Sequence, residues 1–383
     1  MTRTRRVLLV SIGLAAAVAT VIVLTSFSAA TEGPVATALD RLASALASLE
    51  QRARERLSGP GRRRSLDWFE PFRTNPVRLR RPDELLLGAY DGRIPETFEG
   101  VVALERAIGT TFPLVHVYTA WGDRPEQQFP LRLLTTIWNM GSVPLVTWEP
   151  WLSTFENARH PFLPLGEARD RHGLAAVARG DYDFYVDAWA AEAARFDRPL
   201  FLRVAHEMND PYRYPWGPQH NTKEAFIAAW RHIVERFRLA GADNVIWVWS
   251  PHVAYEYWDL YYPGPDVVDW AATGVLNFGP IAQWSRWWTF DEIFGTKYDR
   301  LAAFGKPVMV AELGSLGVGG DRDAWFREAL LDLPARYPAV HAVVFFHVEG
   351  DQTVTYQQVD WTVTRDEPIT RAIGTAIRGY LPR

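Results

Sequence analysis

The sequence predicts an α/β protein whose main domain is a (β/α)₈ barrel, preceded by an N-terminal apolar helix and a short helical stalk. Three observations support this prediction. Eight short apolar runs alternate with helical patterns over about 300 residues, the order and approximate length of a closed parallel barrel. No glycine-rich nucleotide-binding turn follows these runs, which weakens the alternative of an open, doubly wound sheet. Hydrophobic residues make up 48% of the 383 residues, enough for a large core.

The first 30 residues are predicted to be a membrane anchor or a secretion signal. The basic start MTRTRR precedes an uncharged apolar run of about 21 residues, long enough to span a bilayer and longer than the core of most cleaved signals. Small residues follow, so cleavage after Ala29 or Ala30 stays open. In either case the positive-inside rule predicts that the rest of the chain lies outside the cytoplasm, with the membrane as a partner of the uncleaved helix.

Residues 31–80 are predicted to form a stalk and a linker. Leucines recur at coiled-coil spacing at Leu39, Leu42, Leu46 and Leu49. Two heptads are equally compatible with a short amphipathic helix that lies on the main domain. The stretch SGPGRRRS then indicates a linker, so we expect the barrel domain to occupy residues 81–383.

The predicted strands cover residues 85–90, 114–118, 143–148, 200–205, 244–249, 271–277, 307–311 and 340–346. The clearest helix between them covers residues 225–239. Thr222 can cap its N-terminus, and apolar residues at helical spacing form one face.

Composition and missing motifs exclude several functions. The chain has no cysteine, which excludes disulfide scaffolds and thiol catalysis. Its net charge of −4 gives no indication of a nucleic-acid partner. The stretch HEMND lacks the second histidine of a zinc-protease motif, and no G-x-S-x-G is present. We therefore expect neither a metal site nor a serine triad.

Four acidic residues directly follow apolar strands: Asp91, Glu149, Glu207 and Glu312. In barrels of this class the active site lies at the carboxyl ends of the strands. A glutamate at a strand end is often only a helix cap or a surface ion-pair partner. That interpretation stays open above all for Asp91 and Glu149, although we also expect Glu149 among the substrate-binding residues.

Side-chain alternation predicts where these glutamates point. Arg203, Ala205 and Glu207 should share one face of their strand. Val308, Val310 and Glu312 should share a face too, so that Glu312 enters the barrel mouth if the two valines fill the interior.

Two glutamates that face each other across a barrel mouth meet the requirement for cleavage of a glycosidic bond. One protonates the leaving oxygen, while the other stays ionised and attacks the sugar. We expect Glu207 and Glu312 in these roles, with Arg203 favouring the ionised form of Glu312. His206 and Asn209 are predicted to bind sugar hydroxyls or to orient the glutamates.

The 17 tryptophans suggest a sugar-binding cleft, because flat aromatic rings suit the apolar faces of sugars. Some belong to helix cores, for example Trp189 and Trp230. The candidates for stacking lie at strand ends and in loops: Trp121, Trp148, Trp151, Trp216, Trp258, Trp284, Trp287 and Trp288.

Several segments together resemble glycoside hydrolase family 26, best known for endo-β-1,4-mannanases. They are RVAHEMNDPYRYPWG, VTWEPW, NVIWVWSPH, YYPGPDVVDW and KPVMVAELGS, in the family's order between about Leu85 and Trp361. The resemblance implies a (β/α)₈ barrel of the retaining clan without a cofactor. It also implies Glu207 as acid/base and Glu312 as nucleophile, with His206 and Trp216 at the matching family positions.

Two segments depart from the family pattern. Where members carry a tyrosine that supports the nucleophile, this chain has Leu276, which cannot donate a hydrogen bond. Near the eighth strand Phe346 or His347 would have to replace a tryptophan platform. These observations predict a retaining endo-β-glycanase that acts on a β-linked polysaccharide. The alternative is a carbohydrate-binding or polysaccharide-assembly protein on a hydrolase scaffold with weak or no catalysis.

Overall fold

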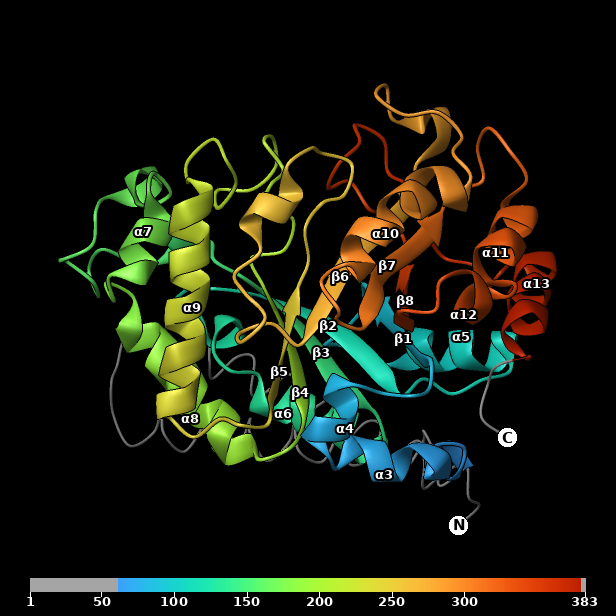
Figure 1. The fold of residues 1–383 in the computed structure, drawn as a ribbon, viewed down its shortest axis with the longest axis horizontal. Coiled ribbons are helices and arrows are strands. Elements are labelled where there is room, and N and C mark those ends of the chain that lie inside the picture. The colour runs from blue at the N-terminus through green and yellow to red at the C-terminus, as the bar shows by residue number, and fades with distance from the viewer. Residues whose placement is uncertain (1–60, 380–383) are drawn as a thin grey trace, which may run out of the picture. The chain divides into compact units, whose positions relative to one another are not determined.

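The computed structural model describes residues 61–379, which form a closed barrel of eight parallel strands in sequence order (Figure 1). This confirms the predicted (β/α)₈ barrel, and each predicted strand coincides with an observed one apart from its ends. The strands are β1 Leu86–Asp91, β2 Leu114–Ala120, β3 Val143–Glu149, β4 Leu200–Val204, β5 Val245–Trp249, β6 Trp270–Asn277, β7 Val308–Ser315 and β8 Val340–His347.

Helices surround the barrel, with α8 and α9 on one side and α11 and α13 on the other (Figure 1). Thr222 caps α9 as predicted, because its side chain accepts the Ala225 N–H. The helices outside the barrel are α5 Glu99–Ile108, α6 Leu131–Asn139, α7 Gly173–Ala178, α8 Asp183–Phe196, α9 Lys223–Leu239, α10 Thr296–Ala302, α11 Arg322–Leu330, α12 Leu333–Arg336 and α13 Glu367–Ile377.

Residues 61–80 pack against the end of the barrel where the strands begin. They include the short helices α3 Glu70–Arg73 and α4 Pro76–Arg80 (Figure 1). Phe69 and Leu79 are fully buried against the first residues of strands β1 and β2. The expectation of a linker up to residue 80 is therefore wrong for these residues, because their apolar side chains close the lower opening of the barrel.

The predicted membrane helix and leucine repeat lie in residues 1–60, outside the described residues. Within residues 61–379, no helix is long and apolar enough to cross a membrane.

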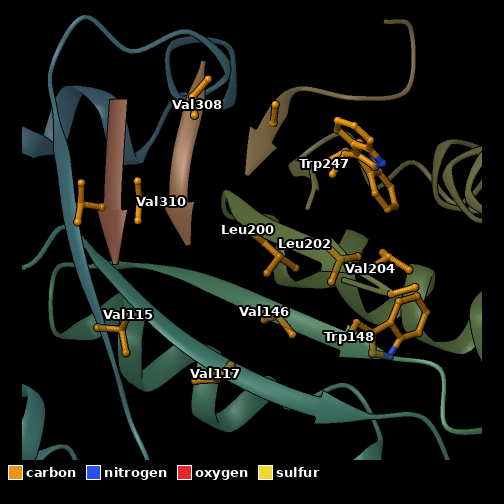
Figure 2. Packing of buried hydrophobic residues seen from close by; sticks show 14 of the residues in the cluster. Val115, Val117, Val146, Trp148, Leu200, Leu202, Val204, Trp247, Val308 and Val310 are labelled. Atoms are coloured by element: carbon orange, nitrogen blue, oxygen red, sulfur yellow. The ribbon is translucent and has the colours of Figure 1, made fainter. Parts of the chain in front are cut away.

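The barrel wall separates two apolar layers. The outer layer, between strands and helices, includes Val308, Val310 and Trp148 (Figure 2). The inner layer fills the lower barrel and includes Met309 and Ala311. The prediction that Val308 and Val310 face the interior is therefore wrong. On regular alternation Glu312 would point outward with them.

A β-bulge in β7 turns the side chain of Glu312 toward the barrel interior. Along the pairing of β6 with β7, Thr273 lies opposite Val310 and Gly274 opposite Glu312, so Ala311 is an extra residue. An extra residue in a strand reverses the alternation that follows it. Ala311 therefore packs inward, and Glu312 also faces the barrel interior.

Candidate active site

A pocket of about 650 Å³ opens at the carboxyl ends of the strands, and we call it the mouth pocket. Its walls combine carboxylates with aromatic rings, which suits a ligand with polar edges and apolar faces. The residues that line it are Tyr90, Tyr118, Glu149, Trp151, His206, Tyr212, Arg213, Tyr214, Leu276, Phe278, Glu312, Phe346, Asp351, Thr353 and Val354.

Glu312 is held at the base of the mouth pocket by two donors on one oxygen. The Tyr118 hydroxyl and Arg203 Nη2 each donate to Oε1 at 2.6 Å. Burial alone would raise the pKa of Glu312, but the Arg203 guanidinium and these hydrogen bonds hold it below the ordinary value for a glutamate. Glu312 is thus an ionised carboxylate with a fixed orientation.

The support for Glu312 comes from three neighbouring strands. Parallel register places Tyr118 of β2 opposite Thr147 of β3, and Thr147 opposite Arg203 of β4. Thr147 Oγ1 accepts from Arg203 Nε at 2.7 Å and lies 2.7 Å from His116 Nε2. Arg203 is 1% exposed, so its guanidinium is fixed from below. It reaches Glu312 as the sequence predicts.

Glu207 reaches the mouth by a turn that follows β4. The strand ends at Val204, and the next residues leave extended geometry, with φ of 44° at Ala205 and 52° at Glu207. The alternation expected for Arg203, Ala205 and Glu207 therefore stops at the strand end. The Glu207 N–H donates to the Ser250 carbonyl at 2.7 Å, which fixes this turn against β5.

The two glutamates converge above Gly274 of β6. Glu312 Oε2 lies 3.5 Å, and Glu207 Oε1 3.8 Å, from the position that a Cβ atom on Gly274 would occupy. Glu207 has a different partner from Glu312, because Arg213 Nη1 donates to its Oε2 at 3.3 Å. Glu312, whose arginine is buried, therefore lies next to Glu207, whose arginine lies at the edge of the pocket.

Glu149 and His206 also line the mouth pocket, as the sequence predicts. Trp151 Nε1 donates to Glu149 at 3.2 Å, and burial raises the pKa of this carboxyl. Burial, followed by the charge of Arg203, holds the pKa of His206 well below its usual value, so the ring is neutral. The Tyr214 hydroxyl lies 3.1 Å from His206 Nε2.

Asn209 does not contact the pocket. Its side chain donates to the His252 carbonyl and accepts the His252 N–H, both at 2.8 Å. The expectation that it binds sugar is wrong for this geometry, because both ends of the amide hold the loop after β5.

Four of the eight predicted stacking tryptophans are buried behind the wall. Trp121, Trp148 and Trp258 are fully buried, because their rings face the surrounding helices and loops. Trp148 is the outward neighbour of inward Glu149 on the same strand. Trp216 is 2% exposed and stacks under Tyr214 at 4.5 Å, so Tyr214 forms the wall instead.

The other four predicted tryptophans are not buried. Trp287 and Trp288 are half-buried outside the lining of the mouth pocket. Trp151 lines the pocket, and Trp284 is 64% exposed beside Phe278, with ring centroids 5.1 Å apart. On strand β8, the alternation of side chains places Phe346 in the pocket. His347 points outward, and its Nδ1 lies 3.3 Å from an Asp91 carboxylate oxygen.

Sequence reasoning missed Tyr90, Tyr118, Arg213 and the hairpin around Asp351. A signal was present for two of them. Tyr90 and Tyr118 end apolar strands at inward positions, but only acidic strand ends were considered as reactive groups. Arg213 and Asp351 lie in loops, where no periodicity indicates direction.

Within residues 61–379, one group of side chains has metal-ligand chemistry. Glu207, Asp210 and His252 place one potential ligand atom each within 4.8 Å of one another. Glu207 and His252 have other partners, whereas Oδ2 of buried Asp210 has no hydrogen-bond partner. Arg213 Nη1 donates to Glu207, and His252 Nδ1 accepts the Ala254 N–H at 3.2 Å.

Comparison with known sequences connects this geometry to a family. The sequence profile described as Glycosyl hydrolase family 26 matches residues 182–316, which contain both Glu207 and Glu312. Endoglucanase H of Acetivibrio thermocellus is 29% identical over 303 residues, which are 76% of this chain and 30% of that protein. Beta-1,3-xylanase TXYA of a Vibrio species is 34% identical over 125 residues, 29% of this chain and 25% of the xylanase. The chain spans less than a third of the length of either relative.

Solved structures share the fold. GH26C from a Muricauda species superimposes with a TM-score of 0.58 at 16% identity, over 79% of this chain and 87% of that one. A GH26 beta-mannanase from Bacteroides ovatus gives a TM-score of 0.55 at 18% identity, over 77% of this chain and 90% of that one. At such identities the likeness shows the barrel fold alone.

Proposed function

Since this chain belongs to glycosyl hydrolase family 26, we propose that it hydrolyses internal bonds of a β-linked polysaccharide by double displacement. The observation that carries the proposal is the convergence of Glu207 and Glu312 above Gly274, one of them held ionised by a buried arginine. Double displacement needs one ionised carboxylate and one proton donor on opposite sides of the scissile bond. The two glutamates supply both.

The first step forms a bond between Glu312 and the anomeric carbon. Glu207 gives its proton to the leaving oxygen as the glycosidic bond breaks, so the released chain is neutral. In the second step Glu207 takes a proton from water, and the water oxygen replaces Glu312 at the anomeric carbon. Glu312 leaves as the carboxylate, and the product keeps the β configuration. Neutral His206 can accept or donate a hydrogen bond to a sugar hydroxyl throughout.

The class of substrate follows from the pocket walls and the relatives. Tyr214, Phe278 and Phe346 offer ring faces or edges for sugar, while Glu149 offers a carboxyl for hydroxyl groups. The relatives carry the names endoglucanase, beta-1,3-xylanase and mannan endo-1,4-beta-mannosidase. A neutral β-glucan, β-xylan or β-mannan is therefore the proposed substrate.

The alternative of a binding or assembly protein without catalysis rested on Leu276. Its missing hydrogen bond is replaced, because Tyr118 donates to Glu312. No other contact of the two glutamates favours this alternative over hydrolysis.

The test is a product analysis on β-mannan, β-glucan and β-1,3-xylan. We expect oligosaccharides of several lengths from one of them, and NMR should show that the first product formed is the β anomer. Binding without release of reducing ends would favour the alternative function. Release of the α anomer would contradict double displacement.

A further inference from the structure

We infer that the Tyr118 hydroxyl distinguishes the two oxygens of Glu312, so that Oε2 attacks the sugar while Oε1 is held, and that this contact acts mainly when the glycosyl-enzyme is hydrolysed. The inference rests on the proposed function and adds to it a positioning residue on strand β2. Tyr118 acts through Glu312, and its hydroxyl is fixed before any sugar binds.

The asymmetry of the Glu312 contacts is the first argument. Both close donors, the Tyr118 hydroxyl and Arg203 Nη2, use Oε1. Oε2 is the oxygen that lies near the Gly274 position, on the side where Glu207 Oε1 also lies. A carboxylate oxygen that already accepts two short charge-assisted hydrogen bonds is the poorer nucleophile, because its lone pairs are occupied. The free oxygen therefore faces the reacting bond.

The position of the Tyr118 ring is the second argument. Tyr90 crosses it nearly edge to face at 4.7 Å, and His116 lies 4.5 Å from its centroid on the side of the barrel interior. Arg203 Nη2 also donates to the hydroxyl, at 3.1 Å. The hydroxyl proton is thereby left for Glu312, since the oxygen already accepts from Arg203. Burial raises the pKa of Tyr118 well above its usual value, which keeps that proton in place.

The residue at the matching level of β6 is the third argument. Leu276 faces the mouth pocket on the strand next to Glu312, and it packs with the apolar cluster of Phe278 and Trp361. A leucine offers no donor, so β6 gives Glu312 no side-chain hydrogen bond. Strand β2, on the other side of the barrel, supplies the hydroxyl instead.

The chemistry of the two steps explains when the contact matters. In the first step Glu312 loses its charge as Oε2 bonds to the anomeric carbon, and hydrogen bonds to Oε1 weaken. In the second step water bonds to that carbon, the bond to Oε2 breaks and the electron pair returns to the carboxylate. Donors on Oε1 stabilise this returning charge, so their loss slows the second step more than the first.

The experiment compares wild type with Tyr118→Phe, using Tyr185→Phe as a matched control. The Tyr185 hydroxyl is also buried and donates to the Gln127 carbonyl, but it lies in the outer layer, away from Glu312. We expect Tyr118→Phe to lower kcat about 10- to 100-fold, which is the effect of one hydrogen bond to a charged group. KM should fall as well, and an aryl glycoside should give a burst of released phenol, because the glycosyl-enzyme accumulates. Tyr185→Phe should show neither the fall in KM nor the burst.

A second readout does not depend on turnover. In protein carrying ¹³C-labelled glutamate, the carboxyl resonance of Glu312 reports its pKa by NMR, and Tyr118→Phe should raise that pKa. A Glu312 pKa equal to that of wild type, together with kcat and KM within twofold, would overturn the inference. An inactive wild type in which Tyr118→Phe still raises the pKa would overturn the proposed function and leave Tyr118 as the residue that positions Glu312.

Discussion

The ends of strands β4 and β7 each carry one glutamate of the site, but the backbone reaches the mouth pocket differently at the two places. Strand β7 continues to Ser315 and turns Glu312 inward through a bulge at Ala311. Strand β4 stops at Val204, and Glu207 follows in a turn with two left-handed residues. Glu312 is thus part of the sheet, whereas Glu207 belongs to a loop whose hydrogen bonds run to β3 and to the residues that follow β5.

The partners of the two glutamates differ in the same sense. The side chain of Arg203, which pairs with Glu312, is 1% exposed, whereas that of Arg213, which pairs with Glu207, is 29% exposed. A nucleophilic carboxylate benefits from a cation held in a fixed position, whereas an acid/base residue must exchange its proton with water. Two identical carboxyl groups can therefore take different roles, because the arginines that pair with them differ in rigidity and in exposure to solvent.

The largest expected difference between the two glutamates is in how the reaction rate of each variant depends on the leaving group. Glu207→Gln should lower the rate on polysaccharide about 10²- to 10⁴-fold, as expected when a general acid is removed. On an aryl glycoside whose phenol leaves without protonation, the first step should be nearly unaffected. Glu312→Gln should be inactive on both substrates. Equal losses for the two variants on the aryl glycoside, measured by pre-steady-state phenol release, would remove the distinction.

A smaller effect is expected on stability. Arg203→Met leaves the Glu312 carboxylate buried without its cation, which costs about 3–5 kcal/mol when one partner of a buried pair is removed. Arg213→Met should cost about 1 kcal/mol or less, because the Arg213 side chain is itself 29% exposed and water screens its charge. Urea unfolding at neutral pH measures both. A larger loss for Arg213→Met would mean that the β4 end, and not the β7 end, is the rigid side of the site.

The pH dependence sharpens the comparison further. Because the pKa of Glu312 is lowered in the folded protein, the acidic limb of kcat/KM should lie below the ordinary glutamate pKa of about 4.3. The same shift stabilises the fold above the ordinary pKa, and this contribution is lost as the pH falls through the lowered value. Circular dichroism at each pH separates loss of activity from unfolding. An acidic limb well above the ordinary value, in folded protein, would show that Glu312 is not held ionised.

The smallest effect concerns the space between the glutamates. Gly274→Ala adds a methyl group at ordinary contact distance from both carboxylates, so the fold should be unchanged. The methyl occupies space at the reacting bond, and kcat/KM should fall by less than about tenfold. Gly61→Ala, where an added Cβ meets no atom within 4 Å, is the control. A Gly274→Ala variant with unchanged kcat/KM would indicate that substrate does not approach this point.

Much of the fold could be predicted because its signals are local. Apolar runs of strand length and the capped pattern of α9 lie within single elements, and the barrel follows from their order. The bulge at Ala311 could not be predicted, because nothing in KPVMVAELGS shows that two successive residues face inward. The packing of residues 61–80 was missed since arginines and glycines at residues 59–64 indicate a linker, while Phe69 and Leu79 bury themselves only against distant strands.

The site was predictable where chemistry and strand position coincide. Glu207, Glu312 and Arg203 lie at the ends of apolar runs, and their charges suggest their roles. The tryptophans show the limit of this reasoning. Trp148 and Glu149 are neighbours in the chain, yet one faces the helices and the other the pocket, so residue type alone does not indicate the side. Tyr118 was overlooked because its partner, Glu312, is 194 residues away in the chain.

The central claim is that Glu312, held from β2 and β4, is the nucleophile and that Glu207 is its proton donor. The most direct test uses a 2-deoxy-2-fluoro glycoside of the sugar that the product analysis identifies, because such a compound slows hydrolysis of the glycosyl-enzyme. After digestion, mass spectrometry should find the label on Glu312, and Glu312→Gln should carry none. A label on Glu207 or Glu149 would contradict the account.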